Sequence, residues 1–334
     1  MTGRDFVGSA SLATRALGRT SLSLTVLGLG SAPLGGLYRP VDDDEAVKTV
    51  AHAYARGIRY FDTAPLYGFG LAERRVGAAL RRQRNDFVIS TKVGRLLRPV
   101  EDAAPDPLFP GAPPLRPVFD FSYDGVMRSF HESLERLGLD SVDILLIHDP
   151  DHHQLEALSG AAKALGAMKA AGVVKAIGVG MNHAGMLQRM ASEADFDCFL
   201  LAGRYTLLEQ TSAEDLLHEC QTRRIGVLIG GVFNSGVLAS TGPEATFDYA
   251  PVSRAILDRV RGIQAICSRW NVPLKAAALQ FPLAHPAVTS VVTGPRSVAE
   301  LDELCDALTT PVPKEMWEEL RHASYIADYC PIPS

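Results

Sequence analysis

The sequence predicts an α/β fold in which eight parallel strands, with helices between them, close into a (β/α)8 barrel of the TIM type. Three observations support this prediction: the chain has 334 residues, it contains eight short apolar segments, and amphipathic segments lie between them. The apolar segments are nearly continuous in β-branched and aliphatic residues, as is typical of strands buried on both faces. They cover residues 25–29, 59–62, 87–92, 142–148, 174–179, 197–202, 225–229 and 288–293.

Helices are predicted between most of these strands, because apolar residues recur there with the period of a helix. The predicted helices cover residues 43–56, 71–82, 122–137, 156–171, 212–223, 251–270 and 297–307. An open, doubly wound sheet is the alternative, since it uses the same alternation. Eight strands favour the barrel, and no linker divides the chain, so we expect one domain over residues 1–334.

Two segments fall outside the alternation. Residues 14–24 have the pattern of a short hairpin, turned at Gly18 and Arg19, which we expect to plug the barrel from below. Residues 95–121 contain seven prolines, too many for a long helix, and they are too many residues for a simple connection. Because they follow the third strand, we interpret them as a long loop that covers a substrate, with a disordered insertion as the alternative.

The composition excludes several classes of protein. The formal net charge is −5, which removes the electrostatic basis for binding nucleic acid or an anionic membrane surface. No apolar run reaches the roughly 18 residues of a membrane span, and the N-terminus lacks the apolar stretch of a signal peptide. The five cysteines are widely spaced, so we expect reduced thiols and a cytoplasmic protein. The oligomeric state stays open.

Ionisable residues interrupt three predicted strands at their C-terminal ends. Asp62 ends the second strand, Lys92 the third and His148 the fourth. Tyr67 follows Asp62 by five residues. The C-terminal ends of barrel strands form one face, so these side chains should meet there. Each residue alone has an ordinary structural explanation, such as a helix cap or an ion pair, but the set of four indicates a catalytic site.

These residue types suit a reaction that moves a hydride and a proton together. A tyrosine hydroxyl can carry the proton, but its ordinary pKa of about 10 makes it a weak acid and base near neutral pH. A lysine ammonium beside it lowers that pKa, and an aspartate keeps the lysine in place and charged. A neutral histidine can then donate a hydrogen bond to the substrate oxygen.

Four blocks of the sequence, in order, resemble the aldo-keto reductase family: residues 57–77, 91–92, 146–151 and 177–182. The resemblance implies an NAD(P)-dependent oxidoreductase on a barrel fold, and it assigns the proton transfer to Tyr67. Lys92 and Asp62 would then tune the pKa of the phenol, and His148 would orient the substrate oxygen.

Within that family, residues 201–208 resemble the NAD(P)-linked sugar 1-dehydrogenases, of the D-threo-aldose or L-fucose dehydrogenase type, and pyridoxal 4-dehydrogenase. This similarity implies hydride transfer between nicotinamide and C1 of an aldose, which yields a lactone, or an aldehyde carbonyl. The alternatives are a pyridoxal 4-dehydrogenase or a general aldehyde reductase. A cofactor-sensing binding subunit is the alternative that is not an enzyme.

The cofactor site is expected on the same face of the barrel. A Rossmann fingerprint at Gly28 and Gly30 is rejected, because Pro33 stands where a third glycine belongs. The resemblance implies that Asn182 binds the nicotinamide carboxamide and that Tyr205 stacks on the nicotinamide ring. An ordinary turn and ordinary aromatic burial are the respective alternatives. The family often has glutamine three residues before this tyrosine, where this chain has Ala202.

Two further segments resemble parts of the family that bind the dinucleotide. The first covers the pyrophosphate, and its residues are Phe233, Asn234, Ser235 and Gly236. The second holds the adenosine phosphate, and its residues are Gly294, Arg296 and Glu300. The arginine suits the 2′-phosphate of NADP, whereas the glutamate repels it, and the balance favours NAD. Residues 297–300 are also a capping box, so a plain helix start is the alternative.

The sequence predicts no metal site. His152 and His153 are adjacent on a predicted loop, so their side chains point apart. The identity of the sugar or aldehyde is expected to depend on residues 95–121 and on the C-terminal tail, residues 325–334, which we expect to close one side of the pocket.

Overall fold

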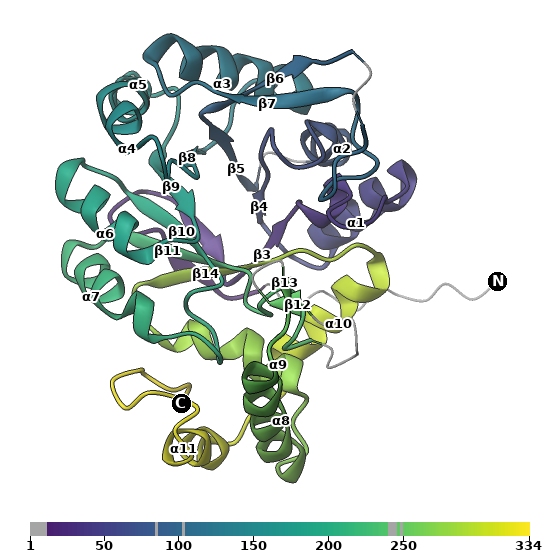
Figure 1. Ribbon diagram of the computed structural model, residues 1–334, viewed down its shortest axis with the longest axis vertical. Coiled ribbons are helices and arrows are strands. Elements are labelled where there is room, and N and C mark those ends of the chain that lie inside the picture. The colour runs from purple at the N-terminus through teal and green to yellow at the C-terminus, as the bar shows by residue number, and fades with distance from the viewer. Residues whose placement is uncertain (1–11, 84–85, 102–103, 240–245, 248–249) are drawn as a thin grey trace.

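The computed structural model describes residues 12–83, 86–101, 104–239, 246–247 and 250–334. Its eight parallel strands form a closed barrel in chain order, so the predicted barrel is confirmed and the open sheet is wrong (Figure 1). The barrel strands are β3 (Leu27–Gly30), β4 (Tyr60–Asp62), β5 (Val88–Val93), β8 (Ile144–His148), β9 (Ala176–Met181), β10 (Cys198–Ala202), β11 (Gly226–Gly230) and β14 (Val288–Thr293). Each lies within one of the predicted apolar segments or overlaps it.

Helices surround the barrel and bury its outer face. The predicted ones are α1 (Asp43–Ala55), α2 (Leu71–Leu80), α3 (Tyr123–Leu137), α4 and α5 (Gln154–Glu156 and Ala162–Ala170, joined by a π-helical turn), α7 (Glu214–Arg223), α8 (Arg254–Arg269) and α10 (Val298–Thr309). Three more were not predicted: α6 (Ala184–Glu193), α9 (Leu274–Gln280) and α11 (Lys314–His322). None of these three begins with a Ser, Thr, Asp or Asn cap, and neither do the predicted helices α2 and α7.

The N-terminal hairpin closes the bottom of the barrel, as predicted. β1 (Thr14–Ala16) pairs with β2 (Ser23–Thr25), and Gly18 takes a left-handed φ of 53° in the turn between them. Leu17, Leu22 and Leu24 are buried against side chains that fill the barrel interior. A left-handed turn favours glycine because any other side chain would be strained there.

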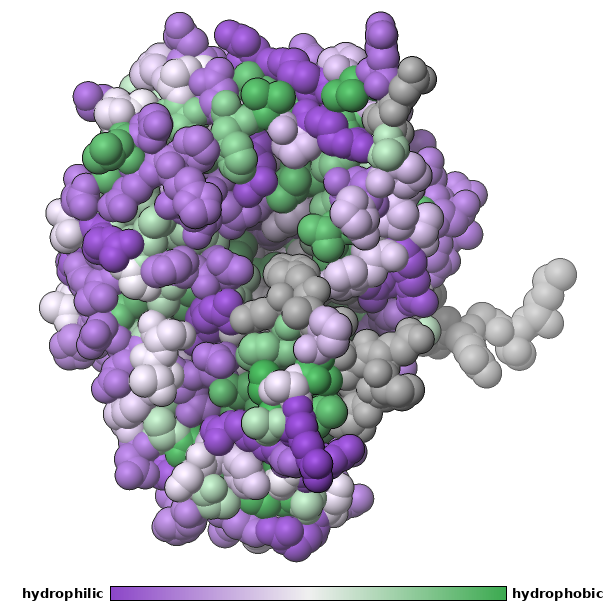
Figure 2. All heavy atoms as spheres, viewed as in Figure 1, coloured by the Kyte–Doolittle hydropathy of each residue, from purple (hydrophilic) through white to green (hydrophobic). Residues whose placement is uncertain are grey.

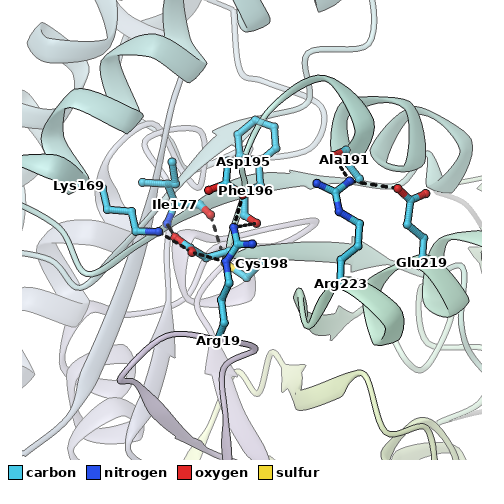
Figure 3. Close-up of polar contacts among 10 residues, drawn as sticks. Arg19, Lys169, Ile177, Ala191, Asp195, Phe196, Cys198, Glu219 and Arg223 are labelled. Atoms are coloured by element: carbon cyan, nitrogen blue, oxygen red, sulfur yellow. Dashed lines mark hydrogen bonds and ion pairs between the residues drawn. The ribbon is translucent and has the colours of Figure 1, made fainter.

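A buried carboxylate ties this hairpin to the barrel (Figure 3). Asp197, directly before β10, accepts hydrogen bonds from Lys169 Nζ at 2.6 Å and from the backbone N–H of Ile177 at 3.0 Å. Arg19 in the hairpin turn lies 3.7 Å from the same carboxylate and also pairs with Asp195. The Asp197 side chain is 1% exposed and that of Asp195 is 78% exposed, so only Asp197 is shielded from water.

The described part of residues 95–121 follows the third barrel strand, as predicted, but it is not an irregular loop throughout. β6 (Arg95–Pro99) and β7 (Leu115–Phe119) form an antiparallel ribbon beyond the end of β5 (Figure 1). Prolines are tolerated here because a two-stranded ribbon has an outer edge that needs no N–H donors. Gly94 turns the chain into this ribbon with a φ of 101°. A side chain at Gly94 would overlap Phe121.

Among the described residues, no helix is both long and apolar enough to cross a membrane. The face seen in Figure 2 mixes polar and apolar side chains and is hollowed near its centre.

We predict that Asp197→Ala lowers the free energy of unfolding by about 3 kcal/mol, because it leaves a lysine and a buried N–H group without their acceptor. Asp195→Ala is the matched control and should cost less than about 1 kcal/mol, since exposed ion pairs contribute little. Urea denaturation of both variants measures the difference. Equal losses would contradict the assignment of the anchoring role to the buried carboxylate.

Candidate active site

The predicted catalytic residues meet at the C-terminal end of the barrel. Asp62 ends β4, Lys92 lies near the end of β5 and His148 ends β8, and these three strands are neighbours. Lys92 is buried; its Nζ donates to Asp62 Oδ2 at 2.7 Å and to the backbone oxygen of Thr63 at 2.9 Å. The other oxygen of Asp62 accepts from Ser90 Oγ at 2.7 Å. Both members of the ion pair therefore have a further hydrogen-bond partner, Thr63 for Lys92 and Ser90 for Asp62.

Tyr67 reaches this pair from the turn that follows β4. The centre of its ring lies 4.7 Å from Lys92 Nζ and 5.7 Å from the centre of the His148 ring, at an angle of 90°. Gly68, with a φ of 62°, continues the turn against Gly35. Any side chain at Gly68 would overlap the Gly35 backbone, so this close approach positions Tyr67.

The surroundings of Tyr67 act on its proton in opposite directions. Burial raises the pKa of Tyr67 to about 12, although the nearby ammonium of Lys92 lowers it. The sequence predicted the effect of Lys92 correctly and missed the larger effect of burial. Burial works against the charge of Lys92, but Asp62 and Tyr67 outweigh it and raise the lysine pKa. The phenol is therefore protonated and the lysine charged at neutral pH.

His148 is neutral under the same conditions. Burial, followed by the positive charges of Arg95 and Lys92, lowers the pKa of His148 well below its ordinary 6.5. A neutral imidazole carries one N–H group, which suits it to donate a hydrogen bond to a substrate oxygen.

A buried carboxylate on α2 supports the strand that carries Lys92. Glu73 is fully buried, and it accepts from Arg136 Nε at 2.6 Å and from Thr91 Oγ at 2.8 Å. Thr91 directly precedes Lys92, so the two hydrogen bonds of Glu73 link α2 and α3 to the part of β5 that carries Lys92.

Unpaired polar atoms mark the same end of the barrel. Ser31 Oγ and Thr63 Oγ, directly after β3 and β4, are buried without a partner among the described residues. Buried polar atoms normally have a partner, so unpaired ones at the barrel mouth fit a site that is completed by a ligand. Asn182 follows β9 and is exposed there, while Arg204 Nε donates to its backbone oxygen at 3.0 Å. These residues fit a nicotinamide dinucleotide.

The structure contradicts the stacking role predicted for Tyr205. Its side chain is 1% exposed, and its ring packs against Phe281 and His285 with centres 5.3 Å and 5.8 Å apart. Neither ring face is open to a nicotinamide, and ordinary aromatic burial, the alternative, is what the structure has. Five residues after Tyr205, the side chain of Gln210 hydrogen-bonds to the backbone of Tyr325 and Ala327 and so holds the start of the C-terminal tail.

The predicted pyrophosphate loop follows β11, and its residues differ in what they can bind. Asn234 is buried, where its side chain accepts from Thr206 Oγ at 2.6 Å and donates to the Gly203 oxygen at 3.1 Å. Its side chain is thus used to join two loops, and the contact predicted for it with the pyrophosphate stays a prediction. Ser235 hydrogen-bonds to the side chain of Tyr38. Gly236 faces open space and Phe233 is half-buried, so both remain available to a ligand.

The predicted adenosine-phosphate segment forms the capping box of α10. Glu300 accepts from the backbone N–H of Arg296 at 2.7 Å, and its own N–H donates to Ser297 Oγ at 3.2 Å. The other oxygen of Glu300 lies 3.6 Å from Arg39. Arg296 donates to the backbone oxygen of Leu37 at 3.2 Å, and Gly294 packs close to Pro33. The loops after β3 and β14 are thereby joined.

Two residues beside His148 were not predicted from the sequence. Asp149 follows His148 with a left-handed φ of 43°, and its Oδ2 lies 3.4 Å from His148 Nε2. Arg95 Nη2 donates to the same oxygen at 2.8 Å. The acidic residue directly after the strand-end histidine was a visible signal, but its partner lies 54 positions away in the chain.

No group of three or more His, Cys, Asp or Glu side chains among the described residues has the arrangement of a metal site. His153 instead packs against Phe119 and Phe121, with ring centres 4.9 Å and 5.4 Å apart.

Comparison with known proteins agrees with this geometry. Residues 26–324 match the aldo/keto reductase family. The chain belongs to this family. Its members are oxidoreductases that use NAD(P)H, and this protein is one of them.

Several characterised relatives are similar over nearly the whole chain. A pyridoxal 4-dehydrogenase from Microbacterium luteolum is 43% identical over 334 residues, which cover 94% of this chain and 98% of that protein. A D-threo-aldose 1-dehydrogenase from a Pseudomonas species is 43% identical over 314 residues, with coverage of 91% and 95%. L-galactose dehydrogenase from Arabidopsis thaliana is 33% identical over 302 residues, with 88% of each covered.

Solved structures share the fold at lower identity. A glycerol dehydrogenase from Gluconobacter oxydans superposes with a TM-score of 0.76 at 21% identity, covering 96% of this chain and 97% of that one. The holo form of an aldo-keto reductase from Bacillus halodurans superposes with a TM-score of 0.73 at 23% identity, covering 93% and 96%. These likenesses establish the architecture alone.

We predict that Tyr67→Phe lowers kcat by about a thousandfold, because the variant lacks the hydroxyl that transfers the proton. The affinity for the cofactor should change little, since the ring stays in place. Initial rates and calorimetric titration with the cofactor measure the two effects. Tyr54→Phe, which removes a hydroxyl bonded to Asp86 on the outside of the barrel, is the control. Retained turnover in Tyr67→Phe would refute the proton-transfer role.

We also predict that oxidation accelerates as the pH rises from 7 to 9.5. With a pKa of about 12 in the protein alone, the deprotonated fraction of Tyr67 grows about tenfold for each pH unit below that value. The His148 pKa lies well below 6.5, so its titration adds no step in this range. Lys92→Met should shift the rise to higher pH. A rate that falls with pH in the wild-type protein would contradict this assignment.

Proposed function

We propose that this protein is an NAD(P)-dependent dehydrogenase that oxidises C1 of a cyclic aldose to a lactone. The observation that carries the proposal is the meeting of Asp62, Lys92, Tyr67 and His148 at one end of the barrel. The 43% identity to a D-threo-aldose 1-dehydrogenase supports the substrate class.

The chain's own residues would handle the proton and the substrate oxygen. His148 donates its N–H to the C1 oxygen and orients it, while Tyr67, as tyrosinate, takes the C1 hydroxyl proton. The positive charge of Lys92 stabilises the tyrosinate, and Asp62 keeps Lys92 in place. A bound nicotinamide would supply the acceptor for the C1 hydride and a further positive charge next to the phenol. The two C1 electrons leave with the hydride, and the carbonyl of a lactone remains.

Pyridoxal is the second candidate substrate, because a pyridoxal 4-dehydrogenase is equally similar to this chain. Pyridoxal carries a hydroxymethyl group next to its aldehyde and closes to a cyclic hemiacetal in water. Its reacting carbon then bears a hydrogen, a hydroxyl and a ring oxygen, as C1 of an aldose does. The same side chains would therefore perform the same bond changes on either molecule.

The NAD(P) site would lie across the C-terminal face of the barrel. Asn182 would bind the carboxamide, the backbone around Phe233, Ser235 and Gly236 would cover the pyrophosphate, and Gly294 and Arg296 would flank the adenosine. We favour NAD over NADP, because the Glu300 carboxylate already faces Arg39 and bonds to the Arg296 backbone, which leaves less positive charge for a 2′-phosphate.

We further propose that the chain is a single domain, that residues 95–121 cover the substrate, and that the tail, residues 325–334, closes another side of the pocket. The bond of Arg95 to Asp149 supports a position of the ribbon at the site. A cytoplasmic location is proposed because the five cysteines are buried, free thiols.

Initial rates test this function with L-fucose, D-arabinose, L-galactose, pyridoxal and simple aldehydes, each with NAD and with NADP. We expect oxidation of at least one sugar or of pyridoxal, formation of a lactone, and a higher kcat/KM with NAD. Cofactor binding without turnover of any compound would instead favour a cofactor-sensing binding subunit. Reduction of simple aldehydes alone would favour a general aldehyde reductase.

A further inference from the structure

The carboxylate of Asp149, a hydrogen-bond acceptor, lies beside the imidazole of His148, which can donate a hydrogen bond. Asp149 follows His148 in a left-handed conformation, which residues other than glycine rarely adopt and which is common at functional sites. Its backbone N–H donates to the Gly180 oxygen at 3.0 Å, at the end of the neighbouring strand. This turn brings Asp149 Oδ2 to 3.4 Å from His148 Nε2.

Arg95 holds this carboxylate from the base of the ribbon. Its Nη2 donates to Oδ2 at 2.8 Å, and its guanidinium stacks on the Phe119 ring, 4.7 Å from the ring centre. The Arg95 side chain is 14% exposed and that of Asp149 is 32% exposed. No described residue donates to the other carboxylate oxygen of Asp149. The other oxygen of Asp149 is therefore an acceptor without a donor in the described part of the chain, on a side chain that approaches His148.

This arrangement matches two oxygens on one substrate. The oxygen of the reacting carbon accepts from His148, and a neighbouring hydroxyl can donate to the carboxylate at the same time. Two such oxygens in a sugar lie about a hydrogen-bond length apart, so one substrate can reach both the imidazole and the carboxylate, whose Oδ2 is 3.4 Å from His148 Nε2. The aldose has such a hydroxyl on C2, and pyridoxal has its ring hydroxyl beside the carbon that bears the aldehyde.

We infer that Asp149, positioned by Arg95, is the specificity-determining residue that recognises the hydroxyl group next to the reacting carbon. The inference rests on the proposed function and names the part of the substrate that this site selects. A salt bridge that only anchored the ribbon would explain the bond to Arg95. It would explain neither the strained turn nor the approach of the carboxylate to His148.

The test compares D-arabinose with 2-deoxy-D-ribose, the sugar that D-arabinose becomes when it loses its 2-hydroxyl. The quantity measured is the ratio of kcat/KM for the two sugars in each protein. In the wild-type enzyme we expect this ratio to exceed about 100, because a site built to bind a hydroxyl rejects the analogue that lacks it. In Asp149→Ala the ratio should fall at least about tenfold, since the charged hydrogen bond is gone.

Matched variants separate recognition from general damage. Asp151→Ala removes the same charge two residues further along and should keep the wild-type ratio. Arg95→Met should lower the ratio mainly through KM for D-arabinose, and Arg95→Lys should restore part of it. Asp149→Asn retains the size of the side chain, and cofactor binding by this variant shows that the protein is folded.

The outcomes are distinguishable. A ratio that is the same in Asp149→Ala, Asp149→Asn and the wild-type enzyme would overturn this inference and leave the proposed function standing. Absence of turnover by the wild-type enzyme with every sugar and with pyridoxal would overturn both. A fall in the ratio of the two kcat/KM values that occurs in the Asp149 and Arg95 variants, and not in Asp151→Ala, would support the inference that Asp149 recognises the neighbouring hydroxyl.

Discussion

The buried ion pair between Lys92 and Asp62 is the interaction on which the rest of the site depends. Charges are costly to remove from water unless they are paired and hydrogen-bonded. Here both conditions are met, because the Thr63 oxygen accepts from Lys92 and Ser90 donates to Asp62. The pair lets the barrel keep a positive charge beside Tyr67 and His148, where it opposes the rise of the phenol pKa and helps to keep the imidazole neutral.

Contacts between the neighbouring loops and helices hold the residues around this ion pair in place. Glu73 braces β5, Gly68 seats the Tyr67 turn on Gly35, and Asn234 joins the loops after β10 and β11. Each of these contacts uses a buried polar group or a close backbone approach, so each is sensitive to small changes. The side of the site near β6 is different, because one oxygen of Asp149 accepts from Arg95 and no described residue donates to the other. Such an arrangement is suited to substrate selection.

Much of the fold could be predicted because strands buried on both faces leave a strong signal in the sequence. All eight barrel strands were found in this way, and the plugging hairpin was found from its turn at Gly18 and Arg19. Helices α6, α9 and α11 were not predicted. The ribbon of β6 and β7 was taken as a loop because of its prolines. At the site, the four catalytic candidates were found by their positions at or after strand ends, whereas the stacking role predicted for Tyr205 does not fit its burial.

The sequence by itself determined the barrel and the end of it at which Asp62, Lys92, His148 and Tyr67 gather. The reason is that the succession of strands along the chain, and the residue at which each strand ends, can be recognised from local sequence patterns. Only the tertiary structure decided what each side chain touches. It buried the Tyr205 ring, used the Asn234 amide to join two loops and brought Arg95 to Asp149. The physical reason is that burial and pairing depend on residues far apart in the chain, whose packing no local pattern encodes.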